Sequence, residues 1–222
     1  IIESTLTGNT GPYYGGAVDN EGTVTIVRST LSDNGARIGG AVANVGTLSI
    51  RNSTLSGNVA TETSGGIDNF LGEASVEFTT VTANSANSGG GIQNAASISI
   101  KNSLVVNSTA GNNCVNDGGT FTALGVNFST DSSCAGFTQT TTGEINLGPL
   151  SDNGGETHTR ALLSGSVAVD AALDCTLSDG TTTVTQDQRG QARPAGAYCD
   201  SGAFEGVGSL PAIIFDDGFE GG

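Results

Sequence analysis

Apolar residues in the first half of the chain recur with a period of about 25 residues. Three such positions fall in each period, so the apolar residues form three columns when the repeats are aligned. Neighbouring members of a column lie 24 to 26 residues apart. The columns are Leu6, Leu31, Leu55, Val81 and Val105; Val18, Val42, Ile67 and Ile92; and Ile26, Ile50, Val76 and Ile100. This pattern predicts three short strands in every turn of a coil.

Inside each predicted strand, apolar and polar residues alternate. Leu48 and Ile50 share one face, whereas Thr47 and Ser49 share the other. A period of two is typical of a β-strand, and no segment places apolar residues at helical spacing. A unit of this size cannot bury its apolar residues alone, so neighbouring units must stack.

We therefore predict an all-β fold, a right-handed parallel β-helix with three strands per coil of about 24–26 residues. A β-sandwich is the alternative all-β fold. That fold requires hairpin turns between adjacent strands, and the long repeat with a single direction argues against it.

Two columns of Asn and one column of Gly pairs mark the corners of the predicted coils. Asn tolerates the left-handed backbone region, and stacked Asn amides can hydrogen-bond from coil to coil. The Gly pairs precede the second strand, where a sharp bend would exclude a Cβ atom. A carbohydrate-binding groove is the alternative interpretation of these residues. They are Asn9, Asn34, Asn58 and Asn84; Asn20, Asn44, Asn69 and Asn94; and the Gly pairs that begin at Gly15, Gly39, Gly65 and Gly90.

The composition fits a solenoid and excludes some partners. The chain has 35 Gly, no Trp, no Met and 13% charged residues, with a net charge of -15. We expect no nucleic-acid partner, because seven scattered basic residues make no patch that could displace counterions from phosphates. We also expect no membrane insertion, because no apolar run in the sequence reaches 18 residues.

Four cysteines lie in the second half of the chain. Their spacing lacks the C-x-x-C pattern of a metal site, and their even number favours disulfides. We expect Cys114 to pair with Cys134 and Cys175 with Cys199, because sequential pairing closes loops within one or two coils. Three connectivities exist in principle. Disulfides predict an oxidising compartment outside the cytoplasm.

The chain divides into three segments. Residues 1–108 carry the regular repeats, residues 109–205 form irregular, disulfide-linked coils, and residues 206–222 form a linker, an apolar strand and an acidic tail. Within the second segment, residues 118–125 and 161–170 are interpreted as wider coils of the same solenoid. A complete repeat starts at Ser4 without a capping element before it, so we expect another segment or molecule to cover that end.

Several motifs of the second segment occur in an order that a known family shares. They span residues 147–155, 158–166, 169–170, 187–190, 192–194 and 199–205. Together with the repeats, they resemble bacterial secreted choice-of-anchor Q domain proteins, which are similar to pectate-lyase-like right-handed β-helices. This resemblance implies a surface or extracellular protein, and it transfers no catalytic residue to the chain.

The candidate catalytic groups are few. Asp19 and Asp68 share a column with Ala43 and Gln93, so the two carboxylates stand two coils apart, at about 9.6 Å. Polysaccharide lyases and hydrolases need clustered carboxylates with a nearby base, frequently with Ca²⁺. No basic residue stands between these two, and we interpret them as solvated turn residues. We assign no catalytic or metal-binding residue.

Other polar residues have structural interpretations. His158, the single histidine, is expected on a loop. A surface ion-pair cluster is expected around the last disulfide, formed by Asp187, Arg189, Arg193, Asp200 and Glu205. We expect no cofactor, although the tail carboxylates of Asp216, Asp217 and Glu220 could hold a Ca²⁺ ion.

Ser and Thr form regular outward rows on two of the predicted sheets. Such rows could bind ice or a crystalline glycan, but we interpret them as a result of β-propensity and solubility, because Glu73 interrupts them and Ser is mixed with Thr. The rows are Thr5/Thr7, Thr30/Ser32, Thr54/Ser56 and Thr80/Thr82 on one sheet, and Thr23/Thr25, Thr47/Ser49 and Ser97/Ser99 on another.

These observations predict a non-enzymatic, extracellular or cell-surface structural protein. We expect self-association, in which the apolar strand of one subunit extends the first coil of the next and builds a filament. The residues assigned to this contact are Ile1, Ile2, Leu210, Ile213, Ile214 and Phe215. A glycan-binding adhesin, with a polysaccharide as partner, is one alternative. A polysaccharide lyase or hydrolase of the pectate-lyase-like class is the other.

Overall fold

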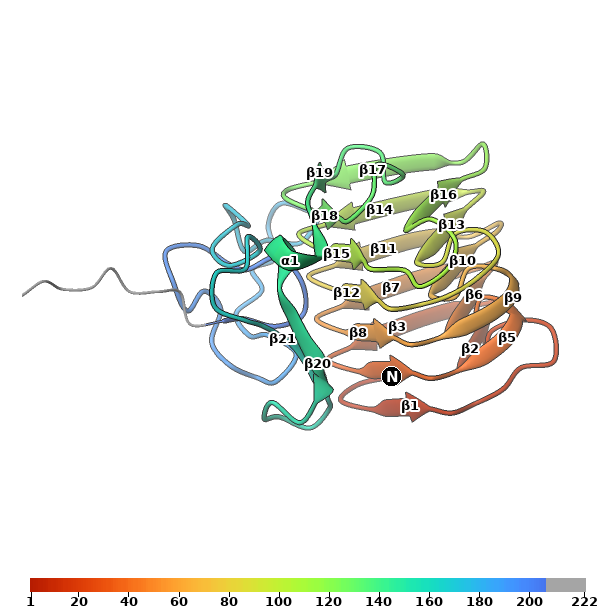
Figure 1. The fold of residues 1–222 in the computed structure, drawn as a ribbon, viewed down its shortest axis with the longest axis horizontal. Coiled ribbons are helices and arrows are strands. Elements are labelled where there is room, and N and C mark those ends of the chain that lie inside the picture. The colour runs from red at the N-terminus through yellow and green to blue at the C-terminus, as the bar shows by residue number, and fades with distance from the viewer. Residues whose placement is uncertain (207–222) are drawn as a thin grey trace, which may run out of the picture.

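A computed structural model describes residues 1–206 and contains a parallel β-solenoid of about five turns (Figure 1). Five successive coils each contribute a strand to each of three parallel sheets, and two further strands extend the first sheet. The first sheet contains β1 (Thr5–Thr7), β4 (Thr30–Ser32), β8 (Thr54–Ser56), β12 (Thr80–Thr82), β15 (Leu104–Val106), β18 (Phe128–Ser129) and β19 (Thr138–Gln139). The second sheet contains β2 (Val18–Asn20), β6 (Val42–Asn44), β10 (Ile67–Asn69), β13 (Ile92–Asn94) and β16 (Cys114–Asn116). The third contains β3 (Thr23–Val27), β7 (Thr47–Arg51), β11 (Glu73–Glu77), β14 (Ser97–Lys101) and β17 (Thr120–Leu124).

The predicted apolar columns line the interior of the solenoid. Leu31 pairs in register with Leu55, and Leu55 pairs with Val81. All three side chains are fully buried, as are the matching residues of the other two sheets. The predicted period and strand stacking are therefore confirmed.

Both predicted Asn ladders are present. The side-chain amide of Asn34 donates to Asn58 Oδ1 at 2.9 Å, and that of Asn58 donates to Asn84 Oδ1 at 2.9 Å. In the second ladder, the amide of Asn44 donates to Asn69 Oδ1 at 2.8 Å. These bonds satisfy buried amides one coil at a time, which fixes the register along the solenoid axis.

The ladder Asn residues tolerate left-handed backbone but do not adopt it. In the first ladder, the residue before each Asn has positive φ instead, including Asp33 at 55° and Ala83 at 57°. The left-handed residue turns the chain, so the following Asn can direct its amide along the solenoid axis. Gly16 behaves as predicted, because a Cβ atom there would lie 2.1 Å from the carbonyl oxygen of Gly40.

After β19 the chain leaves the solenoid. It forms the short helix α1 (Thr142–Ile145), then β20 (Leu147–Ser151) and β21 (Thr159–Leu162), which pair antiparallel with each other. The prediction of a wider coil over residues 161–170 is therefore wrong, whereas β17 places residues 120–124 in the solenoid. We call residues 140–206 the C-terminal region. Figure 1 shows it beside the stacked coils and not at their end.

The C-terminal region covers the outer face of the first sheet. The hydroxyl of Thr30 donates to the carbonyl oxygen of His158, and Thr80 accepts from the N–H of Ala203. Thr30, Thr54 and Thr80 are almost completely buried. From Thr30 onward, the predicted outward row of hydroxyls on this sheet is thus an internal interface, because its hydroxyls supply hydrogen bonds for the irregular backbone packed on them. Thr5 and Thr7, in the first coil, are exposed.

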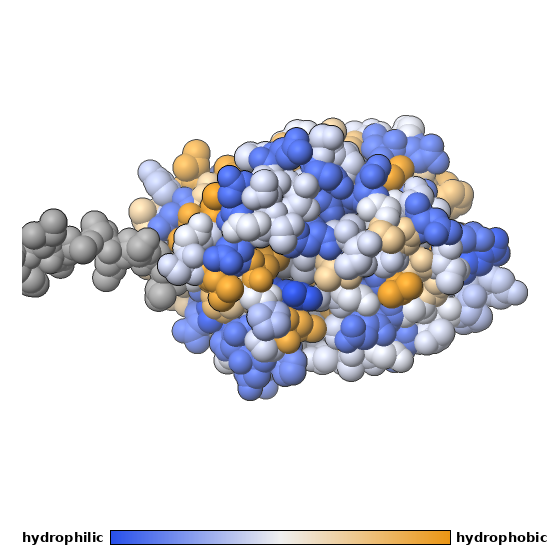
Figure 2. Space-filling view, viewed as in Figure 1, coloured by the Kyte–Doolittle hydropathy of each residue, from blue (hydrophilic) through white to orange (hydrophobic). Residues whose placement is uncertain are grey.

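Both expected disulfides are present, Cys114–Cys134 and Cys175–Cys199. The first joins β16 to the turn before β19, and the second lies inside the C-terminal region. Residues 207–222 lie outside the described residues, so the predicted contacts of Leu210, Ile213, Ile214 and Phe215, and the candidate cation ligands Asp216, Asp217 and Glu220, do too. Ile1 and Ile2 are 41% and 62% exposed, and Ile2 forms a parallel bridge with Val27. The face shown in Figure 2 is mostly hydrophilic, with hydrophobic residues in small areas.

Candidate functional site

A groove of about 410 Å³ runs over the second sheet and is lined by residues of four successive coils. Its floor is the outward row of that sheet. In-register pairing places Asp19 beside Ala43, Ala43 beside Asp68 and Asp68 beside Gln93. We call this cavity the second-sheet groove.

The walls of the second-sheet groove come from the turns that flank the strands. Tyr14 precedes β2, and Thr63 ends β9 (Val59–Thr63), a short strand that pairs with β5 (Gly35–Ile38). Phe70 and Leu71 follow β10. These walls present large apolar surfaces to solvent, since Tyr14 is 56%, Phe70 58% and Leu71 70% exposed.

Asp68 is a buried carboxylate on the groove floor. It is 4% exposed, and the hydroxyl of Thr63 donates to its Oδ2 atom at 2.8 Å. Burial raises the pKa of Asp68, and the hydrogen bond from Thr63 opposes that effect. No described residue donates to the other carboxylate oxygen, so the group keeps hydrogen-bonding capacity for a ligand.

Gln93 adds a second unmet acceptor beside Asp68. Its Oε1 atom is buried and receives no hydrogen bond from residues 1–206. A buried polar atom without a partner costs on the order of 1–3 kcal/mol, which a bound donor would recover. The floor therefore offers two neighbouring acceptors to a molecule in the groove.

The second-sheet groove is acidic. Asp19, Glu21 and Asp68 line it, and none of its described lining residues is basic. Arg37 lies on β5, near one wall, and pairs with Glu62 at 2.7 Å. The groove thus has a negative potential that its own residues do not neutralise.

The sequence placed Asp19 and Asp68 in one row but did not reveal the groove around them. The walls belong to turns that differ from coil to coil, so the repeat pattern contains no information about them. One signal was present: aromatic residues, Tyr13, Tyr14 and Phe70, stand in turns where the other coils have none.

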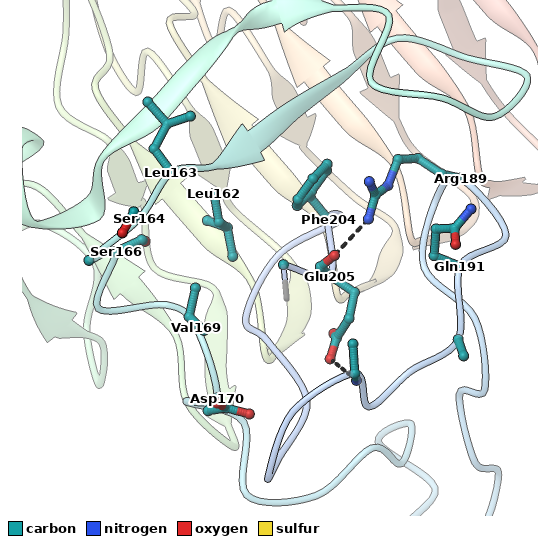
Figure 3. A pocket seen from close by; sticks show the side chains of 14 residues that line it. Leu162, Leu163, Ser164, Ser166, Val169, Asp170, Arg189, Gln191, Phe204 and Glu205 are labelled. Carbon is teal, nitrogen blue, oxygen red and sulfur yellow. Dashed lines mark hydrogen bonds between the residues drawn. The ribbon is translucent and has the colours of Figure 1, made fainter. Parts of the chain in front are cut away.

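A second cavity, of about 740 Å³, lies within the C-terminal region (Figure 3). Its charged groups are already bonded to other groups of the protein. Arg189 lies over the Phe204 ring at 3.5 Å, pairs with Asp187 at 2.7 Å and donates to the carbonyl oxygen of Glu205 at 2.6 Å. We therefore assign these groups to the packing of the C-terminal region.

The predicted ion-pair cluster exists, but its placement on the surface is wrong. Asp187, Arg193, Asp200 and Glu205 are each at most 4% exposed. Arg193 lies 3.3 Å from Glu205 and stacks 4.7 Å from the Phe78 ring centroid. Burial, followed by the charge of Glu205, raises the pKa of Asp200 to about 7. The cluster is buried because the C-terminal region folds onto the solenoid, which the local sequence does not indicate.

In the part of the chain that the structure describes, neither His158 nor a group of possible metal ligands forms a candidate site. The side chain of His158 is exposed, and its carbonyl oxygen accepts the Thr30 hydroxyl. Within residues 1–206, no three His, Cys, Asp or Glu side chains converge as metal ligands. No helix of that part of the chain is long and apolar enough to span a membrane.

The hydroxyl row of the third sheet is at the surface, unlike the part of the first sheet's row that begins at Thr30. Thr23, Thr25, Thr47 and Ser97 are exposed, and Glu73 pairs in register between Thr47 and Ser97. A carboxylate in the middle of the row interrupts the regular hydroxyl lattice.

Comparisons of this chain with protein-family models, curated proteins and solved structures found no match.

Proposed function

We propose that this protein is an extracellular, disulfide-linked β-solenoid that binds a carbohydrate chain in the second-sheet groove without cleaving it. The observation that carries the proposal is the pairing of exposed aromatic walls with a buried polar floor. Tyr14 and Phe70 form the aromatic surfaces, and Asp68 and Gln93 supply acceptors that residues 1–206 leave partly free.

A carbohydrate chain can contact both the aromatic walls and the polar floor of this groove. A pyranose ring has an apolar face of C–H groups that packs on the electron-rich face of an aromatic ring. Its hydroxyls project sideways and can donate to the carboxylate of Asp68 and the amide oxygen of Gln93. The groove crosses four coils, about 14 Å of solenoid at the spacing of β-strands, which suits a short stretch of an extended glycan.

The two disulfides favour an oxidising compartment, which agrees with a secreted or cell-surface protein. The resemblance of its motifs to choice-of-anchor Q domain proteins implies the same location. A rigid solenoid there can present a glycan-binding face as an adhesin or as a component of an extracellular matrix.

Binding is favoured over cleavage by the layout of the floor. Glycoside hydrolysis needs two carboxylates on opposite sides of the scissile bond. Asp19 and Asp68 stand in one row with Ala43 between them, and no described groove residue is a basic group suited to lyase chemistry. A bound glycan would meet both carboxylates from the same side.

The proposal is tested by screening the purified full chain against a glycan array and measuring affinities for the hits by calorimetry. We expect Phe70→Ala and Tyr14→Ala each to weaken binding about tenfold, through loss of stacking surface. Tyr198→Ala is the matched control, because Tyr198 is 48% exposed and lies outside the groove.

Three results would overturn the proposal. The proposal is contradicted if no glycan class binds. It is also contradicted if a glycan binds but the two groove substitutions leave its affinity unchanged. Release of new reducing ends or unsaturated sugars from a bound polymer would establish the enzyme alternative in its place.

A further inference from the structure

We infer that the second-sheet groove selects glycans with free amino groups, that is, chains of protonated amino sugars. This inference rests on the proposed glycan binding and specifies its ligand class. It follows from the negative charge of the groove, from the free hydrogen-bond acceptors on its floor and from its aromatic walls.

The charge of the groove excludes one class of glycan and favours another. Three carboxylates line it, those of Asp19, Glu21 and Asp68, and its described lining contains no Lys or Arg. The whole chain, with these three carboxylates included, has a net charge of -15. A chain of uronic acids would be repelled by this potential, whereas a cationic chain would be attracted to it.

The free acceptors on the groove floor also favour a ligand that donates hydrogen bonds. Asp68 has one oxygen without a partner in the described residues, and Gln93 Oε1 is buried without one. Two of the nearby donors are already used, whereas the side-chain amide nitrogen of Gln93 donates to no group of residues 1–206. Asn44 Nδ2 donates to Asn69 at 2.8 Å within the ladder, and the hydroxyl of Thr63 donates to Asp68.

A protonated amine fits such a floor better than a hydroxyl does. An ammonium group has three donors and no acceptor, so it can bond both free acceptors at once and needs no donor from the protein. A hydroxyl bond to the Asp68 carboxylate is charge-assisted too, but an ammonium brings the opposite charge and so adds an ion pair to that bond. A sugar hydroxyl has one proton and would satisfy one acceptor at a time.

The aromatic walls are compatible with a cation. The faces of Tyr14 and Phe70 attract a positive charge as well as the C–H face of a sugar ring. An amino sugar offers both features in one residue. A small, fully hydrated cation would leave the apolar walls without a partner.

The test compares oligosaccharides that differ in one group. Binding of the full chain to β-1,4-linked glucosamine oligomers is measured by calorimetry beside N-acetylglucosamine oligomers of the same length, in weakly acidic buffer where the free amine is protonated. An oligomer of uronic acid, with and without Ca²⁺, forms the third arm. We expect the amine form to bind about tenfold or more tightly than the acetylated form, and its affinity to fall with added salt.

Two variants assign this preference to the groove. Asp68→Asn keeps an acceptor for the Thr63 hydroxyl but removes the charge, and it should reduce the ratio of amine to acetylated affinity to near one. Should that variant fold poorly, Asp19→Asn combined with Glu21→Gln changes exposed residues and should lower the same ratio. Glu156→Gln, an exposed carboxylate outside the groove, is the control that should leave the ratio unchanged.

The outcomes separate this inference from the proposed function. Equal affinity for amine and acetylated oligomers overturns the amino-sugar inference while glycan binding stands. Tighter binding of the uronic acid oligomer, in either the presence or the absence of Ca²⁺, overturns it as well. Failure of every oligomer here and on the array overturns both proposals.

Discussion

The hydroxyl of Thr54 donates to Oε1 of Gln188 at 2.6 Å, across 134 residues of sequence. Both side chains are buried at the contact between the first sheet and the C-terminal region. The amide nitrogen of Gln188 donates to the Thr30 hydroxyl at 2.8 Å and to the Thr157 hydroxyl at 2.9 Å. One side chain thus links two coils of the solenoid to the region packed on them.

Replacing Gln188 by Ala should loosen the C-terminal region. The substitution leaves the buried hydroxyl of Thr54 without a partner and removes the bonds from Gln188 to Thr30 and Thr157, so we expect a loss of about 2–3 kcal/mol in the free energy of unfolding. Urea denaturation measures this loss. Gln191→Ala is the control, because the Gln191 side chain is exposed, and it should change stability by less than about 0.5 kcal/mol. Equal stability of the two variants would contradict the central role of Gln188.

The Asn ladder gives a second prediction. Asn58 is fully buried, and its side chain makes four hydrogen bonds that connect the second, third and fourth coils. We expect Asn58→Ala to cost about 3 kcal/mol, because it removes all four bonds and leaves the buried backbone N–H of Asn34 without its acceptor. Asn9→Ala, an exposed position in the first coil, should cost about 0.5 kcal/mol. Thermal and urea unfolding report the difference, and similar costs at the two positions would show that the ladder does not stabilise the stack.

The sequence predicts the repeating positions and the disulfide pairs, but not how the non-repeating region packs. Leu31, Leu55 and Asn58 recur at one period, so their positions in the stack follow from alignment alone. The burial of Thr54 does not follow from it, because Thr54 looks like any outward hydroxyl until residues 157–188 cover it. Packing of this non-repeating region depends on single contacts between residues more than 100 positions apart, as the contact of Thr54 with Gln188 shows.

The candidate site also has one part that the sequence predicts and another part that it does not. The row of Asp19, Ala43, Asp68 and Gln93 is visible in the aligned repeats, and the structure confirms it. The burial of Asp68 and the walls of Tyr14 and Phe70 depend on turns of variable length. Those turns determine whether a polar row is solvated or becomes the floor of a groove.

Head-to-tail assembly stays a prediction from the sequence, because Leu210, Ile213, Ile214 and Phe215 lie outside the described residues. If this apolar segment adds to the sheets of another subunit, a chain ending at Gly206 should sediment as a monomer while the full chain forms larger particles. Analytical ultracentrifugation over a range of concentrations distinguishes the two. A full chain that stays monomeric, or a truncated chain that still assembles, would contradict the prediction.

The buried cluster around Arg193 predicts that stability depends on pH. Burial and the charge of Glu205 raise the pKa of Asp200 to about 7, whereas an unfolded Asp carboxyl has a pKa of about 3.9. Between these values the folded protein holds a proton that the unfolded chain has released. The free energy of unfolding should therefore fall as the pH rises from about 4 to 7 and level off above 7. The pKa of Asp179 is lowered to about 2 by hydrogen bonds from Thr182, so its contribution is lost only in stronger acid.

Urea midpoints at several pH values between about 4 and 8 measure this dependence. Asp200→Asn removes the titrating group and should flatten most of the slope, even if the lost acceptor lowers stability at every pH. Asp152→Asn, an exposed carboxylate in a loop of the same region, should keep the slope of the unmodified protein. Stability that rises with pH over this interval would mean that Asp200 is ionised in the folded protein and that Arg193 compensates its charge more fully than the burial of the cluster indicates.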